Sequence, residues 1–439
     1  MMLPLVTCPS IVRVHSVPLK GLFSAPQRVH FQRYLTGLLV SDNVTVTGIN
    51  SLFVDHKDQS SLNRFLTAAP WSAPELNDAR IALLRQKLLP VQPRRGFLVI
   101  DDTLAHKYGP LMPGVGEFFD HSQGRRTLAQ DVLTTFLVMD DKRFPIDLSL
   151  YYQFRAKEER ADIQAQAQAA ITQGDLAALR RYLVALLDYK KRRDRFRTKL
   201  VMAAELVDKA VDRQLPFATV LFDAWFLDKT LIGHIESKGK AWIGECRSNR
   251  IVFVGGERLH VSDLRQRLPS TAYHPVTVGD TTYWAFTKVV RMSTLGKVRL
   301  TISLDNPALT GDPRYLVTRQ LHWNAGTILN AYDKRRQTEP FYRDEKHHLG
   351  FEECQLRDEQ GTIRHWYLTF LAYSLCQLEI ALSRPGQGGQ PRLETVGDCC
   401  RQANAELVGA LVRWIIHRME QGEGAEAVIH SLLGHFSAR

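Results

Sequence analysis

The chain has 439 residues and a mass of 50.0 kDa, which is too long for one ordinary domain. Hydrophobic residues make up 44% and charged residues 23%, so global disorder is excluded and a sizeable core can be buried. The 57 Lys and Arg exceed the 46 Asp and Glu, giving a net charge of +11. That excess indicates a polyanionic partner such as nucleic acid, although a merely basic soluble protein explains it equally well.

Cysteine usage and the N-terminus indicate the compartment. The six cysteines are scattered without a C-x-x-C pair, which favours a reducing cytoplasm over a disulfide framework or a zinc site. Residues 1–24 lack a basic region followed by an unbroken apolar core, so we expect a flexible arm rather than a signal peptide. The most apolar long stretch, residues 366–382, is short for a membrane span and predicts a buried core helix. We therefore expect a cytoplasmic protein that does not enter a membrane.

Residues 25–95 predict a helical N-terminal region. Two short helical segments, Thr47–Phe53 and Ser60–Ala68, are separated by a polar turn and have the spacing of a helix-turn-helix. Ordinary packing of short helices is the commoner explanation of such a pattern. On the first interpretation, this region binds DNA.

Beyond residue 96 the pattern changes to strands alternating with helices. The run Phe97–Asp101 is a short apolar segment of the kind that forms a buried central strand. We expect further strands at 134–139, 144–152, 217–223 and 241–246, and helices at 161–213 and 229–237. A block of short strands, placed at about 247–312, reads as an insertion in the α/β region, which spans 96–382. A Gly- and Pro-rich linker at 383–392 and a C-terminal helical region at 393–439 follow.

Two of the expected buried strands end in aspartate. Asp101 and Asp223 each follow an apolar run, and a carboxylate there is costly unless it meets solvent, a partner or a metal. The ends of central strands are where α/β folds place their sites. Asp102 is an alternative to Asp101, but successive strand residues point to opposite faces, so one of the two should face the site. A simple strand cap or turn explains each acid taken alone.

A third group of polar residues has helical spacing. Tyr332, Arg335, Glu339 and Lys346 fall within a sector of about 60° on a helical wheel. A solvated charged face with an Arg335–Glu339 pair explains any two of them. It does not explain why Glu339 should accompany two strand-end acids.

Three converging carboxylates repel one another unless cations neutralise them. Hard oxygen ligands favour Mg²⁺ or Mn²⁺, and two such ions are suited to phosphodiester chemistry. The phenol, guanidinium and ammonium of Tyr332, Arg335 and Lys346 are suited to nucleic-acid phosphates. The pattern therefore predicts a metal-dependent site for nucleic acid.

These residues carry a family resemblance. The segment YDKRRQTEPFYRDEK contains a Tyr-x2-Arg-x3-Glu-x6-Lys signature with all four residues in register, and in this the chain resembles the DDE-type transposases of bacterial insertion sequences. The resemblance also covers VIDDT around Asp101, the segment from His106 to Arg125, LFDAWF around Asp223 and the segment FYRDEKHHLGFEECQLR. It spans roughly residues 34–382.

The resemblance implies a ribonuclease-H-like core, a mixed sheet flanked by helices, with a β-rich insertion between the second Asp and the Glu. It implies that Asp101, Asp223 and Glu339 hold two Mg²⁺ or Mn²⁺ ions and that Tyr332, Arg335 and Lys346 hold DNA phosphates. Such enzymes cut DNA at the terminal inverted repeats of their element and join the 3′-OH ends to target DNA. A homodimer on DNA, associated with the nucleoid, is the expected assembly.

Some features are open or depart from the pattern. Pro340 follows Glu339 at once and should kink the helix at that turn, which makes the position of Lys346 less certain than that of the others. The basic run Lys190–Lys199 could follow a DNA backbone or be a solvated helix face. Fallback acids outside the signature are Asp344, Glu345, Glu352 and Glu353. A catalytically silent DNA-binding derivative and another two-metal nuclease are the alternative functions. We find no phosphate-binding or dinucleotide fingerprint, so no nucleotide cofactor is expected.

Overall fold

The computed structural model describes residues 3–55, 57–88, 96–140, 142–154, 156–383 and 392–437. Its strands are β1 (Gly96–His106), β2 (Val115–Asp120), β3 (Arg125–Met139), β4 (Lys142–Tyr151), β5 (Phe217–Phe222), β6 (Ala241–Glu245), β7 (Ile251–Val254), β8 (Glu257–His260), β9 (His274–Val278), β10 (Thr281–Met292), β11 (Gly296–Leu304) and β12 (Arg314–Thr318). All of them belong to one large mixed sheet.

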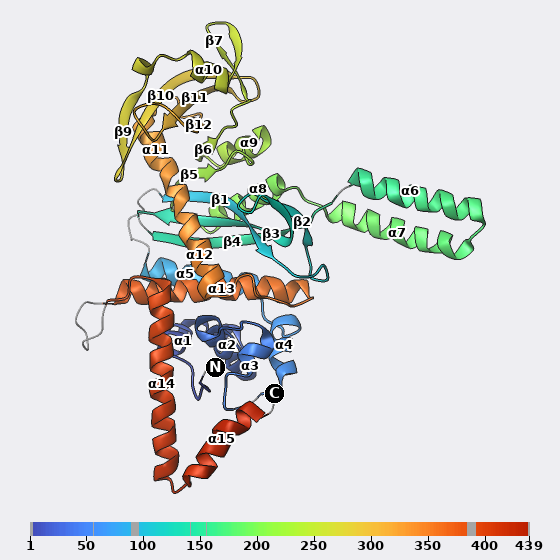
Figure 1. Ribbon diagram of the computed structural model, residues 1–439, viewed down its shortest axis with the longest axis vertical. Helices are drawn as coiled ribbons and strands as arrows, with labels where there is room; N and C mark the ends of the chain where they lie inside the picture. Colours follow the sequence, from blue (N-terminus) through green and yellow to red (C-terminus); the bar gives the residue numbers. More distant parts are fainter. Residues whose placement is uncertain are drawn as a thin grey trace.

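The helices lie before, between and after these strands (Figure 1). They are α1 (Ser10–His15), η1 (Val17–Leu22), α2 (Ala25–Val40), α3 (Val46–Asn50), α4 (Gln59–Thr67), α5 (Ala73–Lys87), α6 (Ala156–Gln173), α7 (Leu176–Arg195), α8 (Lys199–Asp212), α9 (Lys229–Ser237), α10 (Val261–Arg267), η2 (Ser270–Ala272), α11 (Ala325–Asp333), η3 (Lys334–Gln337), α12 (Thr338–His348), α13 (Glu359–Leu382), α14 (Val396–Glu420) and α15 (Ala425–Ser437). In the described ranges, no helix is both long and apolar enough to cross a membrane.

The first half of the sheet has the strand order expected of a ribonuclease-H-like core. Strands β4, β3, β1, β5 and β6 lie side by side in that order. β1, β5 and β6 are parallel, whereas β3 and β4 run antiparallel as a meander. The central strands are buried apolar runs, since Leu98, Val99 and Ile100 are fully inaccessible to solvent. The predicted α/β class and ribonuclease-H-like core are confirmed.

The remaining strands extend the same sheet beyond β6. β12 pairs antiparallel with the end of β6, and β11, β10, β7 and β8 follow outward. β9 pairs with β10 on the edge opposite β11, which is also the edge that β7 pairs with. These strands form the upper β-rich part of the molecule in Figure 1, directly above the core strands. The β-rich segment is therefore attached to the core through backbone hydrogen bonds, and α11 leads from it back to the site.

The N-terminal segment is ordered, which corrects the expectation of a flexible arm. Residues 10–22 form α1 and η1, and Ile11, Val12 and Leu19 are buried against the helical region. The start of α1 is fixed by Ser10, whose backbone N–H and hydroxyl donate hydrogen bonds of 2.8 and 2.7 Å to Glu406 of α14. The apolar residues of this segment, although broken by polar ones, pack on the helices that lie beside it.

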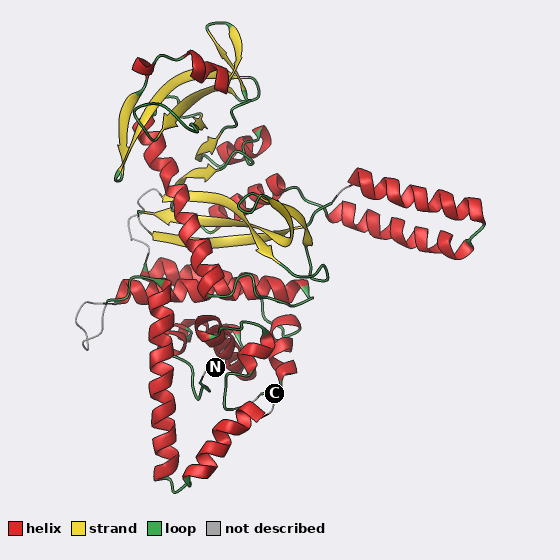
Figure 2. Cartoon of the chain, in the orientation of Figure 1, coloured by secondary structure: helices red, strands yellow, loops and turns green. Residues whose placement is uncertain are grey.

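The predicted helical region at 161–213 consists of three helices rather than one. Gly174, with a φ of +67°, ends α6, and the carboxylate of Asp175 caps α7 by accepting the N–H of Ala178 at 2.9 Å. The helices α6 and α7 form a hairpin that projects sideways from the body of the molecule (Figure 2). α8 then returns and packs on β3 and β4.

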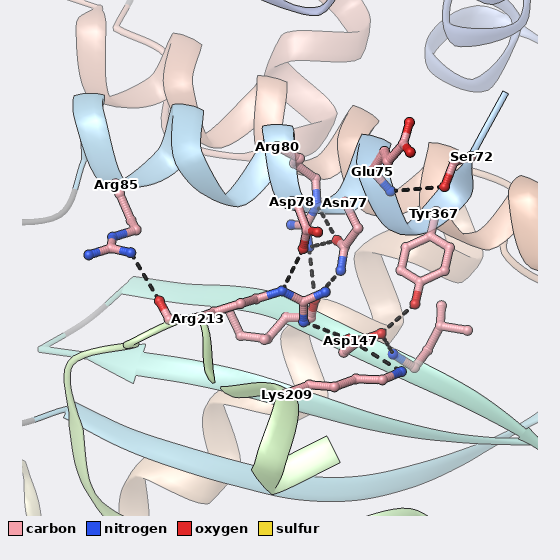
Figure 3. Close-up of polar contacts among 12 residues, drawn as sticks. Ser72, Glu75, Asn77, Asp78, Arg80, Arg85, Asp147, Lys209, Arg213 and Tyr367 are labelled. Carbon is pink, nitrogen blue, oxygen red and sulfur yellow. Dashed lines mark hydrogen bonds and ion pairs between the residues drawn. The ribbon is translucent and has the colours of Figure 1, made fainter. Parts of the chain in front are cut away.

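A buried ionic cluster joins the N-terminal helices to the core (Figure 3). Asp147 of β4 is fully buried and pairs with Arg213, whose Nη1 lies 2.6 Å from the carboxylate. Arg213 also binds Asp78 of α5 at 2.7 Å, and Tyr367 of α13 donates its hydroxyl proton to Asp147. Since Asp147 binds α13 through Tyr367 and reaches α5 through Arg213, the helical layer is fixed relative to the sheet.

Candidate active site

The strand register places three acids in one row. Val99 of β1 pairs with Leu221 of β5, so Asp101 and Asp223, each two residues further on, lie at the same level. Phe222 pairs with Gly244 of β6, which brings Glu245 level with Asp223. Registered side chains of parallel strands point to the same face. The row therefore lies at the carboxyl ends of β5 and β6 and beside the middle of β1, where its parallel pairing with β5 ends.

Asp101 is held by two donors from the segment that follows the β-rich strands. Nη2 of Arg335 lies 2.8 Å from its Oδ1, and the hydroxyl of Thr338 donates to its Oδ2 at 2.9 Å. Burial raises the pKa of Asp101 to about 6 even though Arg335 opposes the shift, and the charges of Asp102 and Asp223 add to it. The carboxylates thus act on one another electrostatically across the strands.

Asp223 closes the turn that follows β5. Its Oδ1 accepts the backbone N–H groups of Trp225 at 2.9 Å and Phe226 at 3.4 Å. The interpretation of this acid as a turn residue is correct, and it accounts for one of the two carboxylate oxygens. Because the turn fixes the carboxylate beside Asp101, the local structural role and a role in the site are compatible.

The signature segment is not one continuous helix, which corrects the expectation of a single helix face. α11 ends at Asp333, the 3₁₀ turn η3 spans Lys334–Gln337, and α12 begins at Thr338. Pro340 is the third residue of α12, where the missing N–H of proline costs no hydrogen bond. The break therefore falls one turn before the proline, between Tyr332 and Glu339 rather than after them.

Three signature residues contact the core strands. The buried Tyr332 directs its hydroxyl to the carbonyl of Phe222 at 3.2 Å and to Oε2 of Glu245 at 3.3 Å. Arg335 binds Asp101, as described above. Lys346 donates to the carbonyl of Leu104 at 2.8 Å. All three lie along the same face of β1, β5 and β6.

Lys346 also belongs to a network beside the site. Its Nζ lies 2.7 Å from Oε1 of Glu352, which is 3.3 Å from Nδ1 of His106. Nε2 of His106 lies 2.9 Å from Asp120 at the end of β2. Two segments that are far apart in the sequence, 106–125 and 341–357, therefore meet at this edge of the site.

Glu339 occupies a different environment from the other acids. It is exposed in the first turn of α12, next to Thr338. Across the described ranges, no group of three or more His, Cys, Asp and Glu is arranged to hold a metal ion. The structure thus brings together Asp101, Asp223, Tyr332 and Arg335, whereas it leaves Glu339 at the rim.

The donor chemistry of the site fits a hard divalent cation at two of the three predicted ligands. Asp101 and Asp223 present carboxylate oxygens at one level, and Mg²⁺ is commonly bound through one or two carboxylates. Burial, which is the main cause of the raised pKa of Asp101, makes its ionised form costly without a cation nearby. Arg335 supplies a positive charge to Asp101 in the structure.

Comparison with known families agrees with this geometry. A family model described as DDE superfamily endonuclease matches residues 18–283, and one described as transposase DDE domain matches residues 197–375. The first match covers more than half of the chain. The chain belongs to the DDE superfamily endonucleases. None of the curated proteins searched matches it.

The resemblance to DDE-type transposases is thereby confirmed, and with it a transposase or endonuclease function. Members of the superfamily generally use divalent metal ions, and transposases act on DNA. Asp101 and Asp223, the acids predicted at strand ends, lie within the residues that the first family model matches.

Sequence reasoning missed two residues of the candidate site. Glu245 lies at the end of β6 and carries the same signal as Asp101 and Asp223, an acid after a buried apolar run. Thr338 could not be found by pattern, because a threonine between two charged motif residues has no distinctive spacing. In the part of the chain that the structure describes, none of the fallback acids contacts Asp101. These acids are Asp344, Glu345, Glu352 and Glu353.

Proposed function

We propose that the transposase cuts DNA at the terminal inverted repeats of a mobile element and joins the freed 3′-OH ends to target DNA. The observation that carries the proposal is the row formed by Asp101 and Asp223, with Arg335 bound to Asp101. This places acids for cations and a guanidinium for phosphates within one site. The branch that carries the Tyr-Arg-Glu-Lys signature, in bacterial insertion sequences, is part of the same proposal.

We assign the cation-binding role to Asp101, Asp223 and Glu339. Two Mg²⁺ or Mn²⁺ ions, when bound, would activate the attacking oxygen and stabilise the leaving oxygen of the phosphodiester. Asp101 lies within β1, and Asp223 directly follows β5. Glu339 follows Thr338, whose hydroxyl binds Asp101, and its exposed side chain is proposed to supply the third carboxylate when DNA and cations are bound.

We assign DNA phosphates to Arg335 and Lys346 and correct the expectation for Tyr332, whose buried side chain supports them instead. A guanidinium binds carboxylate and phosphate oxygens with the same fork geometry, so Arg335 can exchange one partner for the other. Lys346 lies level with Leu104, three residues beyond Asp101 on β1, and carries a compact charge for a neighbouring phosphate. Tyr332 supports this group from the side of the sheet, because its hydroxyl bonds to the carbonyl of Phe222.

The test is the substitution Asp223→Asn. We expect it to bind DNA that carries the element's end with a dissociation constant within about threefold of wild type, and to lose Mg²⁺-dependent cleavage by at least about 10³-fold. The matched control is Asp228→Asn, because Asp228 caps α9 and asparagine is an equally good cap. Unchanged cleavage by Asp223→Asn would remove this acid from the site.

Two alternatives are separated by the products. A plain two-metal nuclease of the same fold gives only hydrolysis, whereas the proposed enzyme also joins end DNA to a supercoiled plasmid. A silent DNA-binding derivative gives neither product. We further propose that the active form is a homodimer on DNA, associated with the nucleoid, because the reaction joins two ends. Inverted repeats flanking the gene would supply the substrate for all of these assays.

A further inference from the structure

Glu245 is an acid of the site row that the signature does not include. It is the last residue of β6 and is half-buried. Its Oε2 accepts a hydrogen bond from the hydroxyl of Tyr332 at 3.3 Å, and the same hydroxyl lies 3.2 Å from the carbonyl of Phe222. The phenol of Tyr332 is therefore held between the residue that precedes Asp223 and an acid of the next strand.

The position of Tyr332 determines how the chain reaches the site. Tyr332 is the penultimate residue of α11, and Arg335 lies three residues later in η3. A 3₁₀ turn of four residues has poorer hydrogen-bond geometry than an α-helix, so it depends on anchors at its ends. Thr338 binds Asp101 on one side of the turn, and Tyr332 binds β5 and β6 on the other.

The ring of Tyr332 is also held from the side of the β-rich strands. The guanidinium of Arg314 on β12 lies 6.0 Å from the centre of the Tyr332 ring and covers its other side. The anchor is thus enclosed by residues of the core and of the β-rich strands.

We propose that Glu245 is a positioning residue of the active site, which holds Tyr332 and thereby sets the place of Arg335 over Asp101 and Asp223. The inference rests on the proposed function and assigns a role to a residue outside the signature. It predicts that Glu245 acts through hydrogen-bond acceptance by its side chain and through Tyr332, not by direct contact with DNA.

The first test is a double-mutant cycle on single-turnover cleavage of end DNA. We expect Glu245→Ala to slow cleavage about 10-fold, since small misplacement of a positioned group has effects of this size or larger. Its dissociation constant for end DNA in EDTA should stay within about twofold of wild type. Glu245→Gln should recover most of the rate, because an amide oxygen also accepts the Tyr332 hydrogen bond. The double variant with Tyr332→Phe should be no slower than Tyr332→Phe alone.

The second test does not depend on cleavage. Arginine modification by phenylglyoxal, followed at Arg335 by mass spectrometry, should be about threefold or more faster in Glu245→Ala than in wild type, because the η3 turn loses an anchor. The matched control is Glu236→Ala, which removes an acid that pairs with Arg319 and Trp242 instead. This control should leave both the labelling of Arg335 and the cleavage rate unchanged.

The outcomes separate this inference from the proposed function. If wild-type enzyme fails to cut end DNA, the proposed function is wrong, while faster labelling of Arg335 in Glu245→Ala still supports the positioning role. If wild type cuts but Glu245→Ala cuts and is labelled at the wild-type rates, the positioning role is overturned. Additive effects of Glu245→Ala and Tyr332→Phe, or a Glu245→Gln variant as slow as Glu245→Ala, would overturn it as well.

Discussion

Asp101 and Asp102 are neighbours on β1, but their side chains lie in different environments on opposite faces of the sheet. Asp101 faces η3 and α12, where it binds Arg335 and Thr338. Asp102 faces α8, where it binds Lys199. Asp101 is therefore paired with Arg335 of a 3₁₀ turn, whereas Asp102 is paired with Lys199 of an α-helix.

The face of Asp102 is closed. Lys199 binds both Asp102 and Asp131 of β3, and the rings of Tyr151 and Trp225 lie 5.4 and 5.2 Å from its Nζ. Burial, reinforced by the charge of Asp102, raises the pKa of Asp131 to about 7. Lys199 is the first residue of a regular helix and its side chain is only 10% exposed. This cation is thus part of the folded core.

The environment of Asp101 suits the exchange of its cation for another. Its cation comes from a short 3₁₀ turn, its side chain is close to the exposed first turn of α12, and a second acid lies at the same level on β5. Both faces use a carboxylate paired with a cation. On the face of Asp102 the cation is shared and enclosed, which suits a structural role. On the face of Asp101 the cation is held by a short turn, which suits a site.

The largest expected effect concerns stability on the closed face. Lys199→Met leaves the buried Asp131 and the half-buried Asp102 without their cation and should lower the free energy of unfolding by about 3–5 kcal/mol. Arg335→Met leaves a single carboxylate that is partly open to solvent, and should cost about 1 kcal/mol. Urea denaturation of both variants at pH 7.5 measures the difference. Equal losses would mean that the two faces are not distinct.

The same comparison continues along α12, between the exposed Glu339 and the fully buried Glu345. Burial raises the pKa of Glu345 to about 8, and Thr369 and Arg80 offset only part of that shift. The native state thus binds a proton that the unfolded state releases near pH 4.5, so the contribution of Glu345 to stability is lost as pH rises through about 8. Glu345→Gln should therefore raise the melting temperature by an increasing amount, on the order of 5 °C at pH 9 and close to zero at pH 5.

Calorimetry from pH 5 to 9 checks this result. The matched variant is Glu339→Gln, which makes the same change at an exposed carboxylate of the same helix. A Glu345→Gln difference that is flat with pH would show that this carboxyl is ionised throughout the range.

The smallest effect is expected for Lys346. Lys346→Met removes one phosphate contact, so affinity for end DNA should fall several-fold and the slope of log K against log salt should decrease by about one. Lys297→Met removes an exposed charge on β11 and serves as the control. Fluorescence anisotropy between 50 and 200 mM salt distinguishes them. Identical slopes for wild type and Lys346→Met would place Lys346 outside the DNA contact.

The sequence predicted the central strands and their acids because both signals are local. Buried parallel strands appear as unbroken apolar runs, and 217–223 and 241–246 agree with the structure to within a residue at the ends that carry acids, as Phe97 does at the start of β1. β1 continues five residues beyond Asp101 because its outer half pairs with β3, which a local pattern does not show.

The remainder depended on contacts between distant segments. The break at η3 could not be read from spacing, because Pro340 is compatible both with a kink and with the first turn of a new helix. The pairing of Asp101 with Arg335, and not with Lys199, depends on which face of β1 each helix covers. Glu245 also follows a buried apolar run, but it could not be selected from the sequence because it belongs to no spacing motif.

The central claim is that Asp101, and not its neighbour Asp102, belongs to the catalytic face of the sheet. The most direct measurement is Mg²⁺-dependent cleavage of labelled end DNA by Asp101→Asn and Asp102→Asn side by side, with binding of the same DNA in EDTA as the measure of folding and recognition. We expect Asp101→Asn to lose cleavage by at least about 10³-fold and Asp102→Asn to retain it within about 10-fold, both with DNA affinity close to wild type. Loss of cleavage by Asp102→Asn with retention by Asp101→Asn would contradict the account.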